Sequence, residues 1–169
     1  MTQAVYDERF VVAVPRMHPW AKRESIGSVE LKSETMLLLG TGHCFRDQVL
    51  EVCPELSRFS QASGGIQKTF EGSSLETIRH MVASGIGITV LPWTAMPRSV
   101  TSGNGLAESH SDGLLTYLPF HAPAPVRRVV LAWRKSFTRT ATVAVVRQTI
   151  LALGQPGVTV LPDEKPVTH

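Results

Sequence analysis

The stretch "SSLETIRHMVASGIGITVLP", from Ser73 to Pro92, decides the fold class, since it reads as a helix that leads directly into a buried strand. Ser73 and Glu76 have the spacing of a capping box, which satisfies free N–H groups at a helix start. Gly85 stands where a helix commonly ends, and a continuous apolar run then extends to Pro92. One helical face would carry Leu75, Ile78 and Val82. We therefore expect at least one helix–strand unit of an α/β domain.

The same alternation extends along the chain in both directions. Short apolar runs predict strands at Phe10–Pro15, Thr35–Gly40, Gly87–Pro92, Leu114–Pro119 and Arg128–Trp133. Helical spacing predicts helices at Cys44–Val52 and Phe137–Leu153. The apolar stripes of these two helices are Phe45, Val49 and Val52 in the first, and Val143, Val146, Ile150 and Leu153 in the second. Such alternation, with strands that are apolar throughout, is typical of an α/β domain whose strands are buried on both faces.

Composition excludes several classes of protein. The 169 residues are 43% hydrophobic and 18% charged, which suits a folded domain with a sizeable core. The net charge of +3 comes from scattered basic residues, so it gives little support for nucleic-acid contact by this chain. Two cysteines are too few for a secreted disulfide scaffold, and no apolar run reaches the roughly 20 residues of a membrane span. The start does not resemble a signal peptide, so we expect a cytoplasmic protein with reduced thiols and no membrane partner.

Both cysteines, Cys44 and Cys53, lie at the ends of one predicted helix. Nine residues place Cys53 about 180° around the helix axis from Cys44 and roughly 13.5 Å along it. A disulfide requires Cα atoms within about 7 Å of each other. The bond therefore cannot form while the helix persists, and oxidation to a disulfide would require this segment to unwind.

Cys44 is the candidate reactive thiol. It lies in the first helical turn, where the helix dipole favours a thiolate, with His43 and Arg46 as nearby positive charges and Asp47 placed to hold Arg46. Cys53 lies at the unfavourable end, so Cys44 would react with an oxidant and Cys53 would resolve the sulfenic acid. The residues alone leave open that the two thiols are unrelated, at least one being simply buried. The thiols and His43 have poor spacing for zinc, so we expect no metal site and no cofactor.

The sequence also carries a family resemblance. "GHCFRDQVLEVC" at residues 42–53, followed by "SSLETIRHMVASGIGITVLP", resembles the effector domains of peroxide-sensing transcriptional regulators of the LysR type. "HPWA" at residues 18–21 and "LAWR" at residues 131–134 fit the same pattern in order. The resemblance implies a Rossmann-like, periplasmic-binding-protein-like α/β fold.

The resemblance also assigns roles to individual residues. It implies that Cys44 is the peroxidatic cysteine and Cys53 the resolving one. It implies that His43, Arg46 and Asp47 surround the reactive thiol, and that Arg127, in "VRRVVLAWR", supports the thiolate.

The resemblance further predicts how the chain is divided. We expect residues 1–134 to form the redox-sensing effector subdomain, residues 135–154 to be the C-terminal helix of a truncated neighbouring subdomain, and residues 155–169 to be a loose tail. The effector domains that the chain resembles pair with one another, and apolar surface is left over on that helix, so we expect a homodimer or tetramer. Regulators of this type contact DNA through a helix-turn-helix domain, which this chain lacks.

The predicted function is that of a hydrogen-peroxide-sensing regulatory domain, not an enzyme. Two alternatives remain. One is an effector domain that binds a small anionic metabolite near the helix start at Ser73 and Ser74. The other is a thiol peroxidase, whose first chemical step would be the same.

Overall fold

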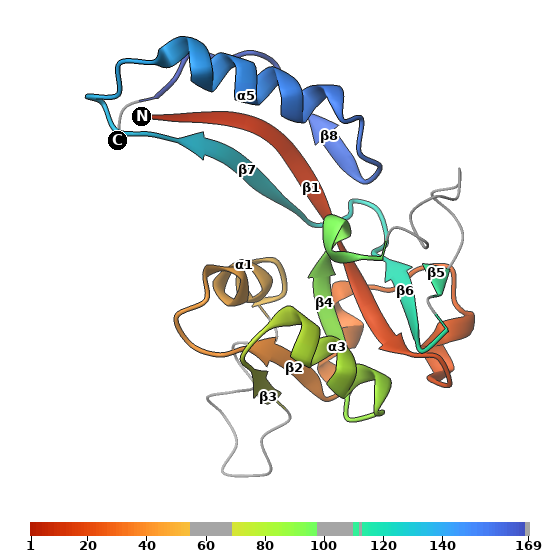
Figure 1. Ribbon diagram of the computed structural model, residues 1–169. Coiled ribbons are helices and arrows are strands. Elements are labelled where there is room, and N and C mark those ends of the chain that lie inside the picture. Colours follow the sequence, from red (N-terminus) through yellow and green to blue (C-terminus); the bar gives the residue numbers. More distant parts are fainter. Residues whose placement is uncertain (55–68, 98–109, 112, 168–169) are drawn as a thin grey trace. The chain divides into compact units, whose positions relative to one another are not determined.

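The structure is a computed structural model that describes residues 1–54, 69–97, 110–111 and 113–167 (Figure 1). The chain divides into two compact units. The central unit is Phe10–Pro125, and the terminal unit combines Met1–Arg9 with Val126–His169. The long strand β1, Thr2–Pro15, contributes its first half to the terminal unit and its second half to the central unit.

The central unit is built on a mixed sheet. Its other strands are β2 (Met36–Leu39), β3 (Thr69–Gly72), β4 (Thr89–Pro92), β5 (His110–Ser111) and β6 (Leu115–Pro119). Strand β1 pairs antiparallel with β4 on one side and with β6 on the other, and β5 pairs with β6. Strands β2 and β3 are parallel, and a parallel bridge between Met36 and Ile88 joins β2 to the segment that leads into β4. In this unit the strands β4-β1-β6-β5 therefore form one sheet, and the parallel pair β2-β3 adjoins it at β4 through that bridge.

Two helices cover opposite faces of this sheet, α1 (Cys44–Val52) and α3 (Leu75–Ala83). Residues of β1 alternate between two apolar clusters, one on each face. The first cluster includes Phe10, Val12 and Val14 of β1 with Val49 of α1, and the second includes Val11 and Ala13 of β1 with Ile78 and Val82 of α3. The prediction of strands buried on both faces is thus confirmed in this unit. Short 3-10 helices span Pro19–Lys22, Ser28–Ser33 and Trp93–Ala95.

Helix α3 begins one residue later than the capping-box pattern predicts. The N-cap is Ser74, not Ser73, and its Oγ accepts a hydrogen bond from the backbone N–H of Thr77 at 3.1 Å. The double serine in the sequence left this shift undetermined, because either hydroxyl could serve as a cap. Gly85 follows the helix with φ of +78°, a left-handed conformation that glycine adopts without strain, as predicted.

The terminal unit has a small antiparallel sheet of its own. Strands β7 (Val126–Ala132) and β8 (Val158–Val160) pair with the first half of β1, and helix α5 (Thr140–Ala152) lies alongside (Figure 1). The predicted first strand begins only at Phe10, because residues 2–9 are largely polar. Pairing on both edges makes them a strand, with Asp7 opposite Arg128 and Glu8 opposite Arg127.

The division of the chain differs from the predicted one in two ways. The unit boundaries fall within β1 and before β7, not at residue 134. The reason is that the first half of β1 pairs with β7 as one antiparallel ribbon, from Thr2 opposite Ala132 to Arg9 opposite Val126. The segment after Gly154 is not a loose tail up to Val167, since β8 pairs with β1 and Val167 exchanges backbone hydrogen bonds with Thr2. The alternating Val-Thr-Val of β8 suits an edge strand.

Helix α5 leaves part of its apolar stripe exposed, as the sequence predicted. Val146 and Leu153 are 43% and 61% exposed, while the most buried residue of the helix is Arg147, at 6%. The Arg147 guanidinium donates to the backbone oxygens of Leu161 and Pro162 at 3.1 and 3.2 Å. This arginine therefore fastens the segment after β8 to the helix.

Candidate functional site

The two cysteines lie at opposite ends of α1, whose bounds Cys44–Val52 match the predicted helix. Cys44 is the first residue of the helix and is exposed, whereas Cys53 is the C-cap residue and is buried, and both are free thiols. At about 1.5 Å of rise per residue the two ends are separated by roughly 13 Å along the axis. The reduced state thus keeps the sulfurs well beyond bonding distance.

The start of α1 is built by a tight turn. Gly42 adopts a left-handed conformation with φ of +93°, which reverses the chain after strand β2. His43 is the N-cap in extended conformation, but its side chain makes no capping hydrogen bond, and only its carbonyl accepts from the Arg46 N–H at 2.9 Å. His43 and Asp47 are both exposed, next to the exposed Cys44. This end of the helix is therefore open to small polar reagents.

Arg46 is anchored on the sheet by two groups. Its Nη1 donates to the backbone oxygen of Leu39, at the end of β2, at 2.9 Å, and to Oε1 of Glu71, in β3, at 2.7 Å. The prediction that Asp47 holds Arg46 is wrong, because the carboxylate that pairs with Arg46 is that of Glu71. Glu71 is 25 residues away in sequence, and no motif marks it. Only the parallel pairing of β2 and β3 brings it to this position.

The environment of Cys53 contrasts with that of Cys44. Cys53 is 1% exposed and belongs to the apolar cluster that contains Val49 and Phe10. Burial raises the pKa of the Cys53 thiol to about 11, because a thiolate there would lose its hydration. At neutral pH roughly one molecule in ten thousand then carries a Cys53 thiolate. In the helical state Cys53 is therefore a poor nucleophile.

The face of α1 that faces the core carries the predicted residues. Val49 is 1% exposed, and the Phe45 ring packs against that of Phe10 with centroids 5.9 Å apart. The Val52 side chain, the third predicted member of the stripe, lies outside what the structure describes. The apolar face of the helix holds the thiol-bearing segment on the sheet, so unwinding it must expose this face.

Arg127, the remaining predicted site residue, belongs to the terminal unit. Its Nε donates to Oε2 of Glu8 at 2.7 Å, and Glu8 is fully buried. The opposite charges face each other across β1 and β7. The positive charge of Arg127 therefore compensates the negative charge of the buried Glu8 carboxylate.

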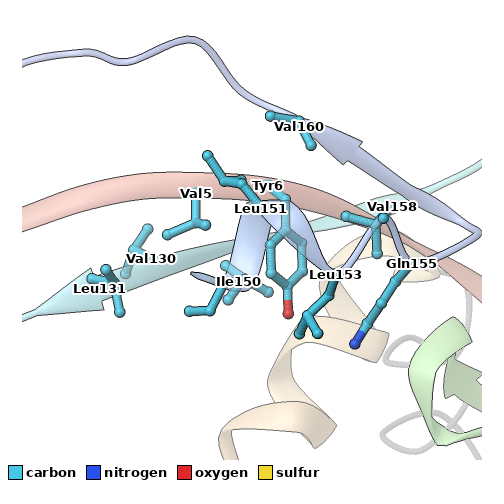
Figure 2. Close-up of a pocket in the computed structure, with 12 residues that line it drawn as sticks. Val5, Tyr6, Val130, Leu131, Ile150, Leu151, Leu153, Gln155, Val158 and Val160 are labelled. Carbon is cyan, nitrogen blue, oxygen red and sulfur yellow. The ribbon is translucent and has the colours of Figure 1, made fainter. Parts of the chain in front are cut away.

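The structure also offers places where a small molecule could bind. Near the start of α3, the Ser74 hydroxyl already bonds to the N–H and hydroxyl of Thr77, so the helix end predicted for a metabolite is capped from within. The terminal unit contains a separate cavity of about 420 Å³ between α5 and the β1, β7 and β8 strands (Figure 2). Its lining is mainly aliphatic, with Tyr6 and Gln155 as the polar side chains. Neither cysteine contributes to it.

The described residues contain neither a metal-binding cluster nor a helix that could span a membrane. Among residues 1–54, 69–97, 110–111 and 113–167, no three histidine, cysteine or acidic side chains gather as a metal-binding group would require. None of the helices described there has the length and apolar character of a membrane span.

Comparison with known proteins places this geometry in a family. The model of the LysR substrate binding domain matches residues 2–155. The chain is 38% identical over 130 residues to the "Hydrogen peroxide-inducible genes activator" of Pectobacterium carotovorum, covering 77% of this chain and 38% of that protein. It is 39% identical over 131 residues to the "DNA-binding transcriptional dual regulator OxyR" of Escherichia coli, covering 77% and 37%. The chain thus spans less than two fifths of the length of these relatives.

A solved structure agrees with both matches. The reduced form of OxyR from Neisseria meningitidis superposes with a TM-score of 0.80 at 37% sequence identity, covering 96% of this chain and 69% of that one. The likeness therefore includes the units that carry β1, α1 and α5 and is not confined to a short motif. The chain belongs to the LysR substrate-binding domain family, in the OxyR group of regulators.

Proposed function

We propose that this chain is the redox-sensing part of a hydrogen-peroxide-responsive transcriptional regulator. Cys44 and Cys53 would form a reversible disulfide whose formation unwinds α1. The observation that carries the proposal is the arrangement of two free thiols at the two ends of one short helix, one exposed and one buried. The relatives named for response to peroxide add support from outside the structure.

The proposed chemistry has two steps. The Cys44 thiolate attacks one oxygen of hydrogen peroxide, the O–O bond breaks, and the products are a Cys44 sulfenic acid and, after protonation, water. Cys53 then attacks the Cys44 sulfur, the S–O bond breaks, and a second water leaves as the disulfide forms. Peroxide is reduced by two electrons and the two thiols are oxidised by two.

Burial of Cys53 supports a defined order for these steps. With its pKa at about 11, Cys53 stays protonated and cannot attack while α1 is helical. Unwinding releases Cys53 from the apolar cluster and returns its pKa toward the ordinary value. The second step thus depends on the conformational change that would carry the signal.

The opposing free energies are of similar size, which suits a reversible switch. Closing the ten-residue loop from Cys44 to Cys53 stabilises the oxidised form by about 3 kcal/mol in the chain-entropy model. The helical form gains roughly 1.5–3 kcal/mol from a fully buried aliphatic side chain such as Val49. Neither term overwhelms the other, so modest changes in either can move the equilibrium.

The test is mass spectrometry of the 169-residue chain after treatment with hydrogen peroxide. We expect the wild type to lose two hydrogens and to yield a peptide cross-linked between Cys44 and Cys53. Cys53→Ser should stop at a sulfenic acid that a dimedone-type reagent traps, and Cys44→Ser should stay reduced. Free thiols in the wild type after this treatment would refute the proposal, and repeated turnover with a thiol reductant would favour a peroxidase.

We also propose that His43 and Arg46, which flank Cys44 at the start of α1, support its thiolate. The support for this is the exposed position of His43 next to Cys44 and the place of Arg46 in the first turn of the helix. The measurement is the rate of sulfenic acid formation in a Cys53→Ser background. Arg46→Gln and His43→Ala should each slow it, and an unchanged rate would remove that residue from the proposal.

The whole protein's partners belong to the same proposal. The Escherichia coli relative is named as DNA-binding, and we propose that DNA contact uses a helix-turn-helix part outside this chain. We further propose a cytoplasmic homodimer or tetramer in which the oxidised and reduced forms pair differently. Size-exclusion chromatography with light scattering, before and after peroxide, tests the pairing, and identical masses and elution volumes would count against it.

A further inference from the structure

The first turn of α1 depends on contacts with the sheet. The helix has nine residues, fewer than an isolated helix needs for stability in water, and its N-cap His43 provides no side-chain cap. Its last turn is held by the buried Val49 and Cys53, whereas its first residue, Cys44, is exposed. Contacts of the first turn with the sheet therefore decide whether Cys44 stays at its helical position.

Besides the packing of Phe45 on Phe10, one polar contact set joins the first turn to the sheet, and we name it the Arg46 tether: the Arg46 guanidinium with the Leu39 carbonyl oxygen and the Glu71 carboxylate. It joins α1 to the ends of both parallel strands, β2 and β3, at 2.9 and 2.7 Å. The Arg46 side chain is only 17% exposed, so its charge is partly shielded from water. Glu71 also lies close to Gly40, in the connection from β2 to α1. A Cβ added at Gly40 would be 3.6 Å from Oε2 of Glu71.

The tether and the disulfide compete. Arg46 follows Cys44 by two residues, and Cys44 must cross roughly 13 Å to reach Cys53. A displacement of that size dismantles the first turn, which carries Arg46 with it and separates its guanidinium from Leu39 and Glu71. The ion pair therefore belongs to the reduced helical state alone.

We propose that Glu71 is a positioning residue that sets the redox equilibrium of the Cys44–Cys53 couple by holding Arg46, and with it the first turn of α1, in the reduced state. This inference rests on the proposed function, since it needs the disulfide to form. Oxidation is the two-step reaction with hydrogen peroxide given above, and reduction by a dithiol or glutathione returns both thiols. Glu71 touches neither sulfur in this account and acts only through Arg46.

The sign of the effect separates this role from a simple charge effect on Cys44. If Glu71 holds the helix, Glu71→Gln weakens the reduced state, and the disulfide becomes harder to reduce. If Glu71 instead merely offset the Arg46 charge near the thiol, Glu71→Gln would strengthen the thiolate, and the disulfide would become easier to reduce. The two possibilities predict shifts of the reduction potential in opposite directions.

The experiment is a redox titration of the full chain in glutathione buffers, with acid quenching, alkylation of free thiols and intact mass measurement. For Glu71→Gln we expect the equilibrium to move toward the disulfide by about three- to tenfold, a potential more negative by about 14–30 mV. The shift should shrink at high salt, because Glu71 is 47% exposed. In an Arg46→Met background, Glu71→Gln should add no further shift.

The matched control is Glu30→Gln. Glu30 also pairs with an arginine of the central unit, Arg23, at 2.6 Å, with side chains 37% and 38% exposed, and its carboxylate also accepts from the backbone N–H of Gly27. Its loss should leave the potential unchanged even where it lowers the melting temperature. Equal potentials for wild type and Glu71→Gln, a shift of the opposite sign, or an equal shift in Glu30→Gln would each overturn the inference. Failure of the wild type to form the disulfide would instead refute the proposed function.

Discussion

The burial of Val49 gives a quantitative prediction for the switch. Val49 is 1% exposed in the apolar cluster that also contains Cys53, and it lies in the middle of the helix that must unwind. Val49→Ala removes two methyl groups, which weakens the helical state by about 1.6 kcal/mol at about 0.8 kcal/mol per buried group. The disulfide state loses little, because its unwound segment no longer buries this side chain.

The expected result is a shift of the thiol–disulfide equilibrium toward the disulfide. A difference of about 1.6 kcal/mol corresponds to roughly fifteenfold in the equilibrium constant, or a reduction potential about 35 mV more negative. Titration in glutathione buffers with alkylation and intact mass measurement gives this number directly. The first oxidation step, followed with a sulfenic acid trap in a Cys53→Ser background, reports separately on Cys44.

Val82→Ala is the matched control for this prediction. Val82 is fully buried on the opposite face of the same sheet, in α3, and the substitution removes the same two methyl groups. It should lower the melting temperature of the reduced protein as much as Val49→Ala does, yet leave the potential within a few millivolts of wild type. Equal shifts in both variants, or no shift in Val49→Ala, would refute the claim that only α1 unwinds.

Three further predictions concern stability. The pKa of Cys53, about 11, exceeds its ordinary value of 9.0, so the unfolded chain loses this proton first as the pH rises. The free energy of unfolding should therefore fall between pH 9 and 11, with a contribution from Cys53 of up to about 2–3 kcal/mol. Urea titrations should show this contribution in wild type but not in Cys53→Ser. Gly87→Ala should lower the melting temperature by about 10 °C, since its Cβ would meet the Thr35 carbonyl oxygen; an unchanged melting curve contradicts this. Glu8→Gln should cost about 1–3 kcal/mol by urea denaturation, as the buried pair with Arg127 is lost; a neutral result would mean that the pair contributes nothing net.

Local patterns predicted the helices and the core strands well. Helix α1 matches its predicted bounds, and Ile78 and Val82 face the core of α3 as their spacing indicates. Both signals are local, since a helix is a set of hydrogen bonds between neighbours four residues apart and its apolar face follows from its period. The first half of β1 escaped prediction because its largely polar sequence becomes a strand only through pairing with distant partners. Strand β8 escaped prediction because a run of three residues is too short to give a local pattern.

In the candidate site, too, some features follow from the local sequence and others only from the tertiary structure. The sequence by itself determined that Cys44 and Cys53 occupy opposite ends of one helix, because nine residues at helical pitch leave no other arrangement. Only the tertiary structure decided that Cys53 is buried while Cys44 is exposed, and that Arg46 is held by Glu71 and not by Asp47. Burial and ion pairing depend on which strands lie side by side, and the pairing of β2 with β3 is a contact between distant parts of the chain that no local period encodes.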